Sequence, residues 1–132
     1  SMPTIFSRII EGEIPCYKIY EDEYTFAFLD INPYTLGHTL IVPKMEEDHI
    51  FNLPEPYYTA LFQTAKILAP AIQKATSSVR VSYVVVGLDV PHTHIHLVPT
   101  KSIDDLQKTA SHKETDEAIK TIQQKILSHI VL

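Results

Sequence analysis

Three histidines alternate with other residues in the segment His92-Thr93-His94-Ile95-His96-Leu97-Val98. Side chains along a β-strand point to opposite faces in turn, so the three imidazoles are predicted to share one face. Neighbouring imidazoles would then lie roughly 6.6 Å apart, two residue rises along the strand. Because each ring carries polar nitrogens that need partners, such a row fills a hydrophobic core poorly. The row is therefore the first candidate for chemistry.

Three interpretations of this row compete. The first is a solvated strand face without a function. The second is a transition-metal site, because two histidines in a His-x-His pair and a distant third, here His49, make a typical zinc set. The third is nucleophilic catalysis, in which one imidazole attacks phosphorus and its neighbours handle protons. The chemistry favours the third, because imidazole has a reference pKa of ~6.5 and is available in its neutral form near pH 7.

Composition limits the class of protein. The chain has 132 residues, of which 45% are hydrophobic and 20% charged, as expected for one globular domain rather than a disordered segment. The formal net charge of −5 provides no global positive field for nucleic acid or anionic lipid. Cys16 is the only cysteine, which favours a reducing compartment. With no signal peptide and no membrane-length apolar run, we expect a soluble, cytoplasmic protein.

The elements that must position the histidines follow from periodicity and turn residues. We expect an α+β fold, in which a five-stranded antiparallel sheet carries one long helix and short helices lie at the N- and C-terminal ends. Residues 1–132 are predicted to form a single domain, with 1–2 as start residues ahead of it and 113–132 as a C-terminal helical extension. The expected helices cover residues 5–10, 52–76 and 114–128, and the expected strands cover 16–20, 24–30, 38–43, 79–86 and 93–98.

Residues 92–98 resemble the signature of the histidine-triad (HIT) superfamily, three histidines alternating with hydrophobic residues, from which Thr93 is a mildly polar departure. The resemblance covers most of the chain. Residues 5–15 are similar to the opening helix of the family, and residues 26–33 to its ribose-binding strand and turn. Residues 37–44, followed by His49, are similar to its next strand and fourth histidine. In this order, ending at the triad, the segments make the resemblance specific, and the branch that the chain resembles is the nucleotide-binding, nucleoside phosphoramidase one.

The resemblance implies roles for the histidines. His94, the middle one, would be the nucleophile and form a nucleotidyl-histidine intermediate that water then hydrolyses. His96 would contact the phosphate or the leaving group. His92 and His49 would order the imidazole network.

The resemblance also implies a nucleotide pocket. Asp30 would accept hydrogen bonds from the ribose hydroxyls, although capping the turn after it is an ordinary role for the same carboxylate. Hydrophobic side chains would enclose the base and line its entrance, and for each of them alone core packing is the simpler interpretation. These side chains are Ile5, Phe6, Ile9, Phe28, Ile31 and Val90.

Two segments depart from the family pattern. Thr4 and Ser7 stand where many relatives carry a Cys-x-x-Cys that contributes to a structural zinc, so we expect no metal and no cofactor. The loop at residues 86–91 is short. It has Val86 where an Asn is expected, and it lacks the Ser or Gln that would reach the leaving group. Asp89 in this loop would repel a polyphosphate.

The leading hypothesis is hydrolysis of nucleoside 5′-phosphoramidates or related AMP derivatives. Dinucleoside polyphosphate hydrolysis is the second, and a nucleotide-responsive binding protein or a metal-dependent hydrolase are alternatives of other classes. The expected partner is a purine nucleotide or its derivative, with neither nucleic acid nor membrane. Relatives are commonly dimers, and the region of Tyr57, Tyr58, Leu61 and Leu68 would either join two copies or cover the sheet.

Overall fold

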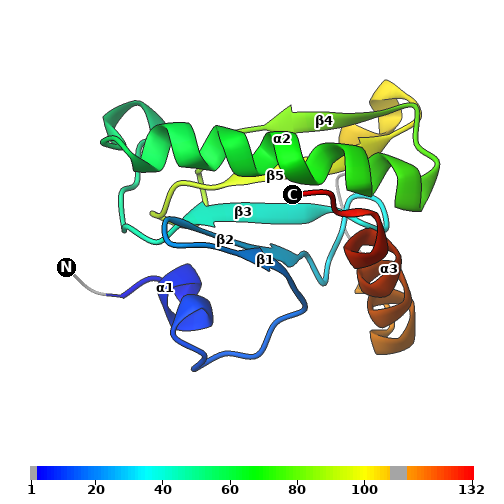
Figure 1. Ribbon diagram of the computed structural model, residues 1–132, viewed down its shortest axis with the longest axis horizontal. Helices are drawn as coiled ribbons and strands as arrows, with labels where there is room; N and C mark the ends of the chain where they lie inside the picture. The colour runs from blue at the N-terminus through cyan, green and yellow to red at the C-terminus, as the bar shows by residue number, and fades with distance from the viewer. Residues whose placement is uncertain (1–2, 108–112) are drawn as a thin grey trace.

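The computed structural model describes residues 3–107 and 113–132, so the expected start residues 1–2 lie outside the described residues. Figure 1 shows the arrangement of the elements along the chain. The helices are α1 (Ile5–Ile10), η1 (Ile50–Asn52), α2 (Tyr57–Thr76), η2 (Ile103–Leu106) and α3 (Asp116–His129), where η marks a 3-10 helix. The strands are β1 (Lys18–Glu21), β2 (Thr25–Leu29), β3 (Thr39–Pro43), β4 (Arg80–Val84) and β5 (Ile95–Thr100).

The five strands form one antiparallel sheet in the order β1-β2-β3-β5-β4. The order departs from the chain order only where β5 inserts between β3 and β4. This insertion places the strand of the third histidine beside β3, with His96 opposite Leu40. The expected α+β fold with a five-stranded antiparallel sheet is confirmed.

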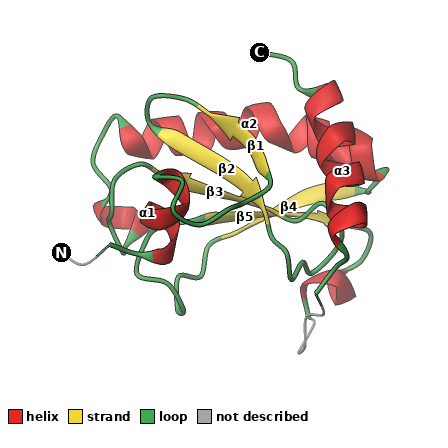
Figure 2. Ribbon diagram, turned by 90° about the horizontal axis from the view of Figure 1, so that it is seen from below, coloured by secondary structure: helices red, strands yellow, loops and turns green. Residues whose placement is uncertain are grey.

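One face of the sheet is covered by α2 and α3, which pack on it in a large aliphatic core (Figure 2). The strands supply every second side chain to this core, as their alternation requires. Leu61 and Leu68 of α2 are fully buried there, so these two residues cover the sheet and do not form an outer surface. The sheet contributes Ala27, Leu29, Ile41, Ile95 and Leu97.

The opposite face carries α1 and a smaller, largely aromatic cluster (Figure 2). Here Phe26 and Phe28 of β2 and Leu40 and Val42 of β3 pack against Phe6 and Ile9 of α1. Phe6 and Phe28 meet with ring centroids 5.8 Å apart. This face, which we call the α1 face, is the one on which the histidines lie.

The long helix begins later than its periodicity suggests. Residues 50–52 form η1, and Pro54 and Pro56 delay the start of α2 to Tyr57. Pro70 lies inside α2, which nonetheless runs to Thr76 as one element with Leu68, Ala71 and Ile72 buried on both sides of the proline. In the described part of the chain, no helix combines the length and the apolar character needed to cross a membrane.

Candidate active site

The histidine row lies at the start of β5, not along its middle. The strand begins at Ile95, whereas the sequence pattern predicted a start at residue 93. The backbone before it pairs with the segment after β3: the Thr93 N–H and hydroxyl both donate to the Glu47 carbonyl, at 2.6 Å each. The His92 N–H bonds to the Val90 carbonyl in a tight turn. His92 and His94 are therefore held by a loop, and only His96 by the sheet.

The three rings nevertheless gather on the α1 face. His94 and His96 lie with ring centroids 4.9 Å apart, closer than the spacing of a regular strand. Phe6 of α1 meets His94 edge-on at 4.9 Å and His92 at 5.7 Å. His94 is 6% exposed and His92 1%. The His92 and His94 rings are thus enclosed by α1, whereas His96 is only half-buried.

The tautomer of His96 follows from a chain of donors that starts at the backbone. The Tyr34 N–H donates to Nδ1 of His38 (3.1 Å), so the proton of the neutral His38 ring sits on Nε2. That Nε2–H donates to Nδ1 of His96 (2.9 Å). Because Nδ1 of His96 accepts this bond, its own proton sits on Nε2. His96 thus offers an N–H donor from its remaining nitrogen.

His38 and His96, the two rings joined by this hydrogen bond, are both neutral at physiological pH. Burial, together with the neighbouring His96 and His94, lowers the pKa of His38 to about 3. Burial and the neighbouring His94 lower the pKa of His96 to about 4. Since desolvation penalises the charged form, neither ring gains a proton near pH 7.

His94 has the opposite tautomer. Its Nδ1 lies 2.7 Å from the backbone carbonyl of His92, which can only accept, so Nδ1 carries the proton. Nε2 of His94 then holds a free lone pair. The row therefore places an imidazole with an available lone pair beside an imidazole with an available N–H, a pairing suited to attack on a centre whose oxygens gain negative charge.

The structure does not place the expected fourth histidine beside the other three. His49 lies on the surface, where it contacts Asp48 and Phe51 and its side chain is 59% exposed. The histidine that bonds within the row is His38, which the sequence reasoning missed. His38 is two residues before Leu40, the partner of His96 across β3 and β5, so the alternation of β3 puts it on the same face. The strand order needed to see this was not available from the sequence.

Asp30 follows β2 and lies beside the imidazoles. Its Oδ1 accepts the Asn32 N–H at 2.8 Å, so the turn-capping role is real. Its Oδ2 lies 3.9 Å from Nε2 of His38, but His38 is neutral near pH 7, so this contact is not an ion pair there. Burial raises the pKa of Asp30, and the bond from Asn32 and the nearby His94 partly offset that. The side chain is 24% exposed, and the turn bond from Asn32 uses only Oδ1.

The hydrophobic residues expected around a base divide into two groups. Phe6, Ile9 and Phe28 are buried in the cluster of the α1 face, and the partly buried Val90 packs against it. Ile5 and Ile31 are 50% and 42% exposed and do not belong to this cluster. Core packing therefore accounts for the first group in this structure, whereas Ile5 and Ile31 present apolar surface to solvent.

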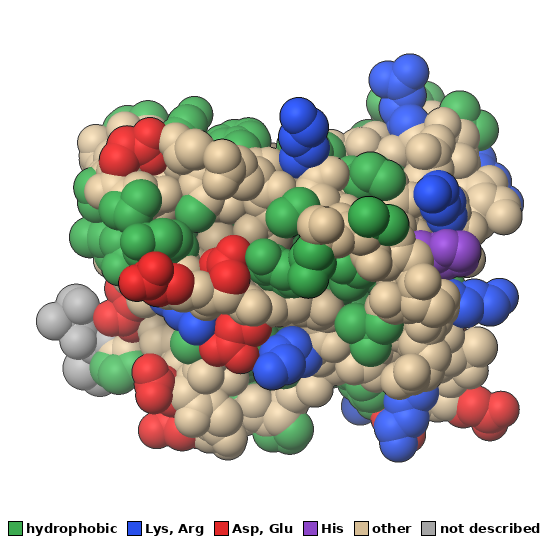
Figure 3. All heavy atoms as spheres, in the orientation of Figure 1, with side chains coloured by type: hydrophobic (Ala, Val, Ile, Leu, Met, Phe, Trp, Pro, Cys, Tyr) green, Lys and Arg blue, Asp and Glu red, His purple; other side chains and the backbone are tan. Residues whose placement is uncertain are grey.

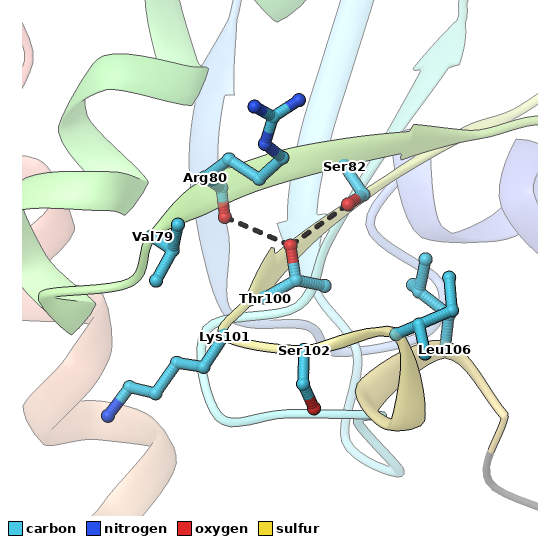
Figure 4. Close-up of a pocket in the computed structure, with 8 residues that line it drawn as sticks. Val79, Arg80, Ser82, Thr100, Lys101, Ser102 and Leu106 are labelled. Carbon is cyan, nitrogen blue, oxygen red and sulfur yellow. Dashed lines mark hydrogen bonds between the residues drawn. The ribbon is translucent and has the colours of Figure 1, made fainter.

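The structure has a further hollow at the other end of β4 and β5, and it does not contain the expected site residues (Figure 4). Its polar groups bond to one another: the Thr100 hydroxyl lies 2.9 Å from the Ser82 hydroxyl and 3.2 Å from the Arg80 carbonyl. The Arg80 and Lys101 side chains point in different directions (Figure 4). No pair of charges converges there, so the histidine row remains the candidate site.

Thr4 and Ser7, at the positions of the Cys-x-x-Cys of many relatives, hydrogen-bond to each other and to neighbours. The Thr4 hydroxyl oxygen accepts the Ser7 N–H at 3.0 Å and lies 2.7 Å from Nδ1 of His92. Within residues 3–107 and 113–132, no group of three or more His, Cys, Asp or Glu side chains is placed to hold a metal ion.

Comparison with known proteins places this geometry in a family. The HIT domain matches residues 11–103. An uncharacterized HIT-like protein of Borreliella burgdorferi is 36% identical over 72% of this chain and 73% of its own length. An adenylylsulfatase of Arabidopsis thaliana is 32% identical over 94% of this chain and 70% of its own length. An adenosine 5′-monophosphoramidase of Saccharomyces cerevisiae is 38% identical over 74% of this chain and 62% of its own length.

Solved structures agree with these sequence matches. A hypothetical histidine triad nucleotide-binding protein of Sulfolobus tokodaii superposes with a TM-score of 0.82 at 28% identity, and the match covers 93% of this chain and 89% of that chain. A Hit-like protein of Bartonella henselae superposes with a TM-score of 0.84 at 25% identity, covering 95% and 94% of the two chains.

Proposed function

The chain belongs to the histidine-triad (HIT) family, and on this basis we propose that it hydrolyses nucleoside 5′-phosphoramidates or related AMP derivatives through a nucleotidyl-histidine intermediate. One observation carries the proposal: the His94 ring holds its proton on Nδ1 against the His92 carbonyl, so Nε2 has a free lone pair. The adjacent His96 ring is held in the opposite tautomer by His38 and offers an N–H. The two rings thus provide a nucleophile and a donor at neighbouring positions.

The reaction would run in two displacements at phosphorus. Nε2 of His94 attacks the α-phosphorus, and the bond to the leaving amine breaks with its electron pair on the amine nitrogen, which takes a proton from solvent. Water then attacks the same phosphorus and gives up a proton to solvent, the P–Nε2 bond breaks and its electron pair returns to His94. In both steps the Nε2–H of His96 donates to a phosphate oxygen on which charge grows. The neutral state of His96 suits this role of a hydrogen-bond donor.

Nucleotide binding would use the groups beside the row. Asp30 retains an oxygen that the turn does not use, and this oxygen would accept the ribose hydroxyls. The exposed apolar side chains of Ile5 and Ile31 would contact the base, with Phe6, Ile9, Phe28 and Val90 behind them. The relatives named adenosine 5′-monophosphoramidase and adenylylsulfatase support an adenylyl derivative as the substrate.

The test is a covalent adduct on one named histidine. Brief incubation with adenosine 5′-phosphoramidate, followed by acid-free digestion and mass spectrometry, should show an adenylyl group on His94. His94→Ala should lose both the adduct and turnover, by at least about 10³-fold, because the nucleophile is gone. His49→Ala is the matched control and should retain both. Turnover that survives in His94→Ala, or requires an added metal ion, would refute the proposal.

A panel of substrates distinguishes phosphoramidate hydrolysis from dinucleoside polyphosphate hydrolysis, the second candidate function. Asp89 is an exposed carboxylate three residues before His92, in a loop that has no Ser or Gln. A dinucleoside polyphosphate would bring several negative charges near this loop, so phosphoramidates should be the better substrates. Faster turnover of diadenosine polyphosphates would reverse this order. AMP binding without turnover of any derivative would favour a nucleotide-responsive binding protein.

A homodimer is part of the same proposal. Tyr58 on the outer side of α2 is 41% exposed, and β4, an edge strand, exposes Tyr83 at 44%. Hydrophobic side chains gather on this face of the molecule over the end where α2 begins (Figure 3). These surfaces would join two copies in the cytoplasm, the reducing compartment that a single cysteine favours. Light scattering after size exclusion should give twice the chain mass.

A further inference from the structure

A line of hydrogen bonds runs from His92 to the surface of the molecule. The Thr4 hydroxyl donates to Nδ1 of His92 at 2.7 Å, and the same hydroxyl oxygen accepts the Ser7 N–H at 3.0 Å. The Ser7 hydroxyl donates to a carboxylate oxygen of Glu46, and the same oxygen accepts the Thr4 N–H at 3.0 Å. Three segments meet in this line: the cap of α1, the loop before β5 and the segment after β3.

We propose that Thr4, Ser7 and Glu46 are positioning residues for the reaction, because they hold the His92 ring and, through its backbone carbonyl, the orientation of the His94 nucleophile. This inference rests on the proposed function for its kinetic consequence. Its structural consequence, the tautomer of His94, is independent of any substrate.

The first step of the argument is that His92 is fixed at both ring nitrogens. Its Nε2 lies 2.8 Å from the Pro43 carbonyl, an acceptor, so Nε2 carries the proton. In the neutral ring, Nδ1 is then an acceptor, and the Thr4 hydroxyl donates a hydrogen bond to it. The ring is 1% exposed, so water cannot replace Thr4 without repacking. Loss of the Thr4 hydroxyl would leave a buried nitrogen without a partner, which drives the ring to move.

The second step links this ring to the nucleophile. The carbonyl that fixes the His94 tautomer belongs to His92 itself. The residue between them, Thr93, is bound by its N–H and its hydroxyl to the Glu47 carbonyl, and Glu47 follows Glu46. The side chain of His92 and the backbone of Thr93 are thus tied to the same short segment after β3. A shift of His92 would change the direction of the acceptor that His94 Nδ1–H needs.

The third step concerns α1. The Thr4 hydroxyl is also the N-cap of this helix, since it accepts the Ser7 N–H at 3.0 Å. Phe6 on the same helix contacts the His92 and His94 rings. One hydroxyl therefore places both the apolar wall of the pocket and the ring behind the nucleophile.

The experiment compares matched threonine caps. Thr4→Val removes the hydroxyl but keeps the shape, and Thr4→Ser restores the hydroxyl. Thr115→Val is the control, because Thr115 caps α3 with the same side-chain bond, to the Ala118 N–H. Ser7→Ala keeps the Thr4 hydroxyl at His92 and removes one of the two hydrogen bonds to Glu46, that of the Ser7 hydroxyl, so it gives a second reading if Thr4→Val folds poorly. Nitrogen-15 NMR of the histidines reports the tautomers, and rapid-quench kinetics with adenosine 5′-phosphoramidate reports adduct formation.

Thr4→Val should mix the tautomers of His94 and slow adduct formation by about 10- to 100-fold, the effect of a small misplacement of a reacting group. Ser7→Ala should show the same changes to a smaller degree, and Thr4→Ser should stay within about threefold of the wild type. Thr115→Val should lower the melting temperature without changing either reading.

The inference is overturned if Thr4→Val and Ser7→Ala keep the His94 tautomer of the wild type, since Thr4 is then only a helix cap. It is also overturned if Thr4→Ser fails to restore that tautomer. Failure of the proposed function would look different: the tautomer would respond to Thr4→Val, but the wild type would form no adduct.

Discussion

The two faces of the sheet use the same strands for opposite purposes. In β5, Ile95 and Leu97 point to the core under α2 and α3, whereas His96 between them points to the α1 face. In β2, Ala27 and Leu29 join the first core and Phe26 and Phe28 the second cluster. The α2 side depends on filled volume, which many hydrophobic residues can supply. The α1 side depends on which nitrogen of each ring carries a proton.

The polar imidazoles on the α1 face need hydrogen-bond partners for their buried nitrogens, and the structure provides them. In the described residues, every buried side-chain nitrogen or oxygen has a hydrogen-bond partner. The partners of the imidazoles come from distant segments: Tyr34 for His38, Pro43 and Thr4 for His92. Buried polar networks of this kind fix one arrangement only when every member is satisfied. The α2 face is therefore expected to set the stability of the fold, and the α1 face to set its chemistry.

The largest expected effect is on the α2 face. Leu68→Ala removes a fully buried side chain from the core between α2 and the sheet. It should lower the free energy of unfolding by about 2–5 kcal/mol. The kcat measured well below the melting temperature should stay at the wild-type value, because Leu68 lies in the core under α2, on the face of the sheet opposite the histidine row. Chemical denaturation and steady-state assays measure the two quantities, and a fall in kcat would break the division between the faces.

Asp30→Asn should give the reverse pattern. A hydrogen bond to a charged acceptor is lost, so AMP should bind roughly 10- to 100-fold more weakly in calorimetry. The melting temperature should stay the same or rise, because burial already raises the pKa of Asp30 and thus disfavours its charged form. The new amide can still accept the Asn32 N–H through its oxygen. Unchanged AMP affinity would remove Asp30 from the pocket.

A smaller effect should appear in the pH dependence of stability. The folded-state pKa values of His38 and His96, about 3 and about 4, lie below the 6.5 of an unperturbed histidine. Between each folded-state pKa and 6.5, the unfolded chain binds protons at these histidines that the folded chain does not. The free energy of unfolding should therefore fall as the pH drops below 6.5. Each histidine contributes at most about 1.4 kcal/mol per pH unit.

The control for this titration is His38→Gln, whose amide can accept the Tyr34 N–H and donate to His96. Denaturant midpoints between pH 7 and pH 5 should fall less steeply in this variant than in the wild type. Equal slopes would show that His38 does not exclude its proton in the folded state.

The sequence was sufficient for the fold because alternation and helical periodicity depend on local composition. The five strands, the long helix and the histidine row were all predicted near their observed positions. The boundary of β5 was not, since its start is decided by Thr93, whose N–H and hydroxyl bind Glu47, forty-six residues earlier. Pairing of this kind leaves no trace in a local pattern.

The fourth histidine was misassigned for a similar reason. The resemblance favours His49 because it follows the residues that resemble the family's next strand, whereas the register of β3 against β5 brings His38 to His96. The roles of Thr4 and Ser7 were likewise hidden. They were considered as positions that lack zinc ligands, whereas the structure shows them bonded to each other and to His92 or Glu46.

Helix α1 has only six residues, fewer than an isolated helix needs to persist in water. It exists because it is docked on the sheet, through a few aromatic contacts and the Thr4 hydroxyl. Release of this one short segment would uncover the His92 and His94 rings while the five strands and α2 remain folded. In the proposed reaction, departure of the product would then need only a local fluctuation, one far less costly than unfolding of the whole domain.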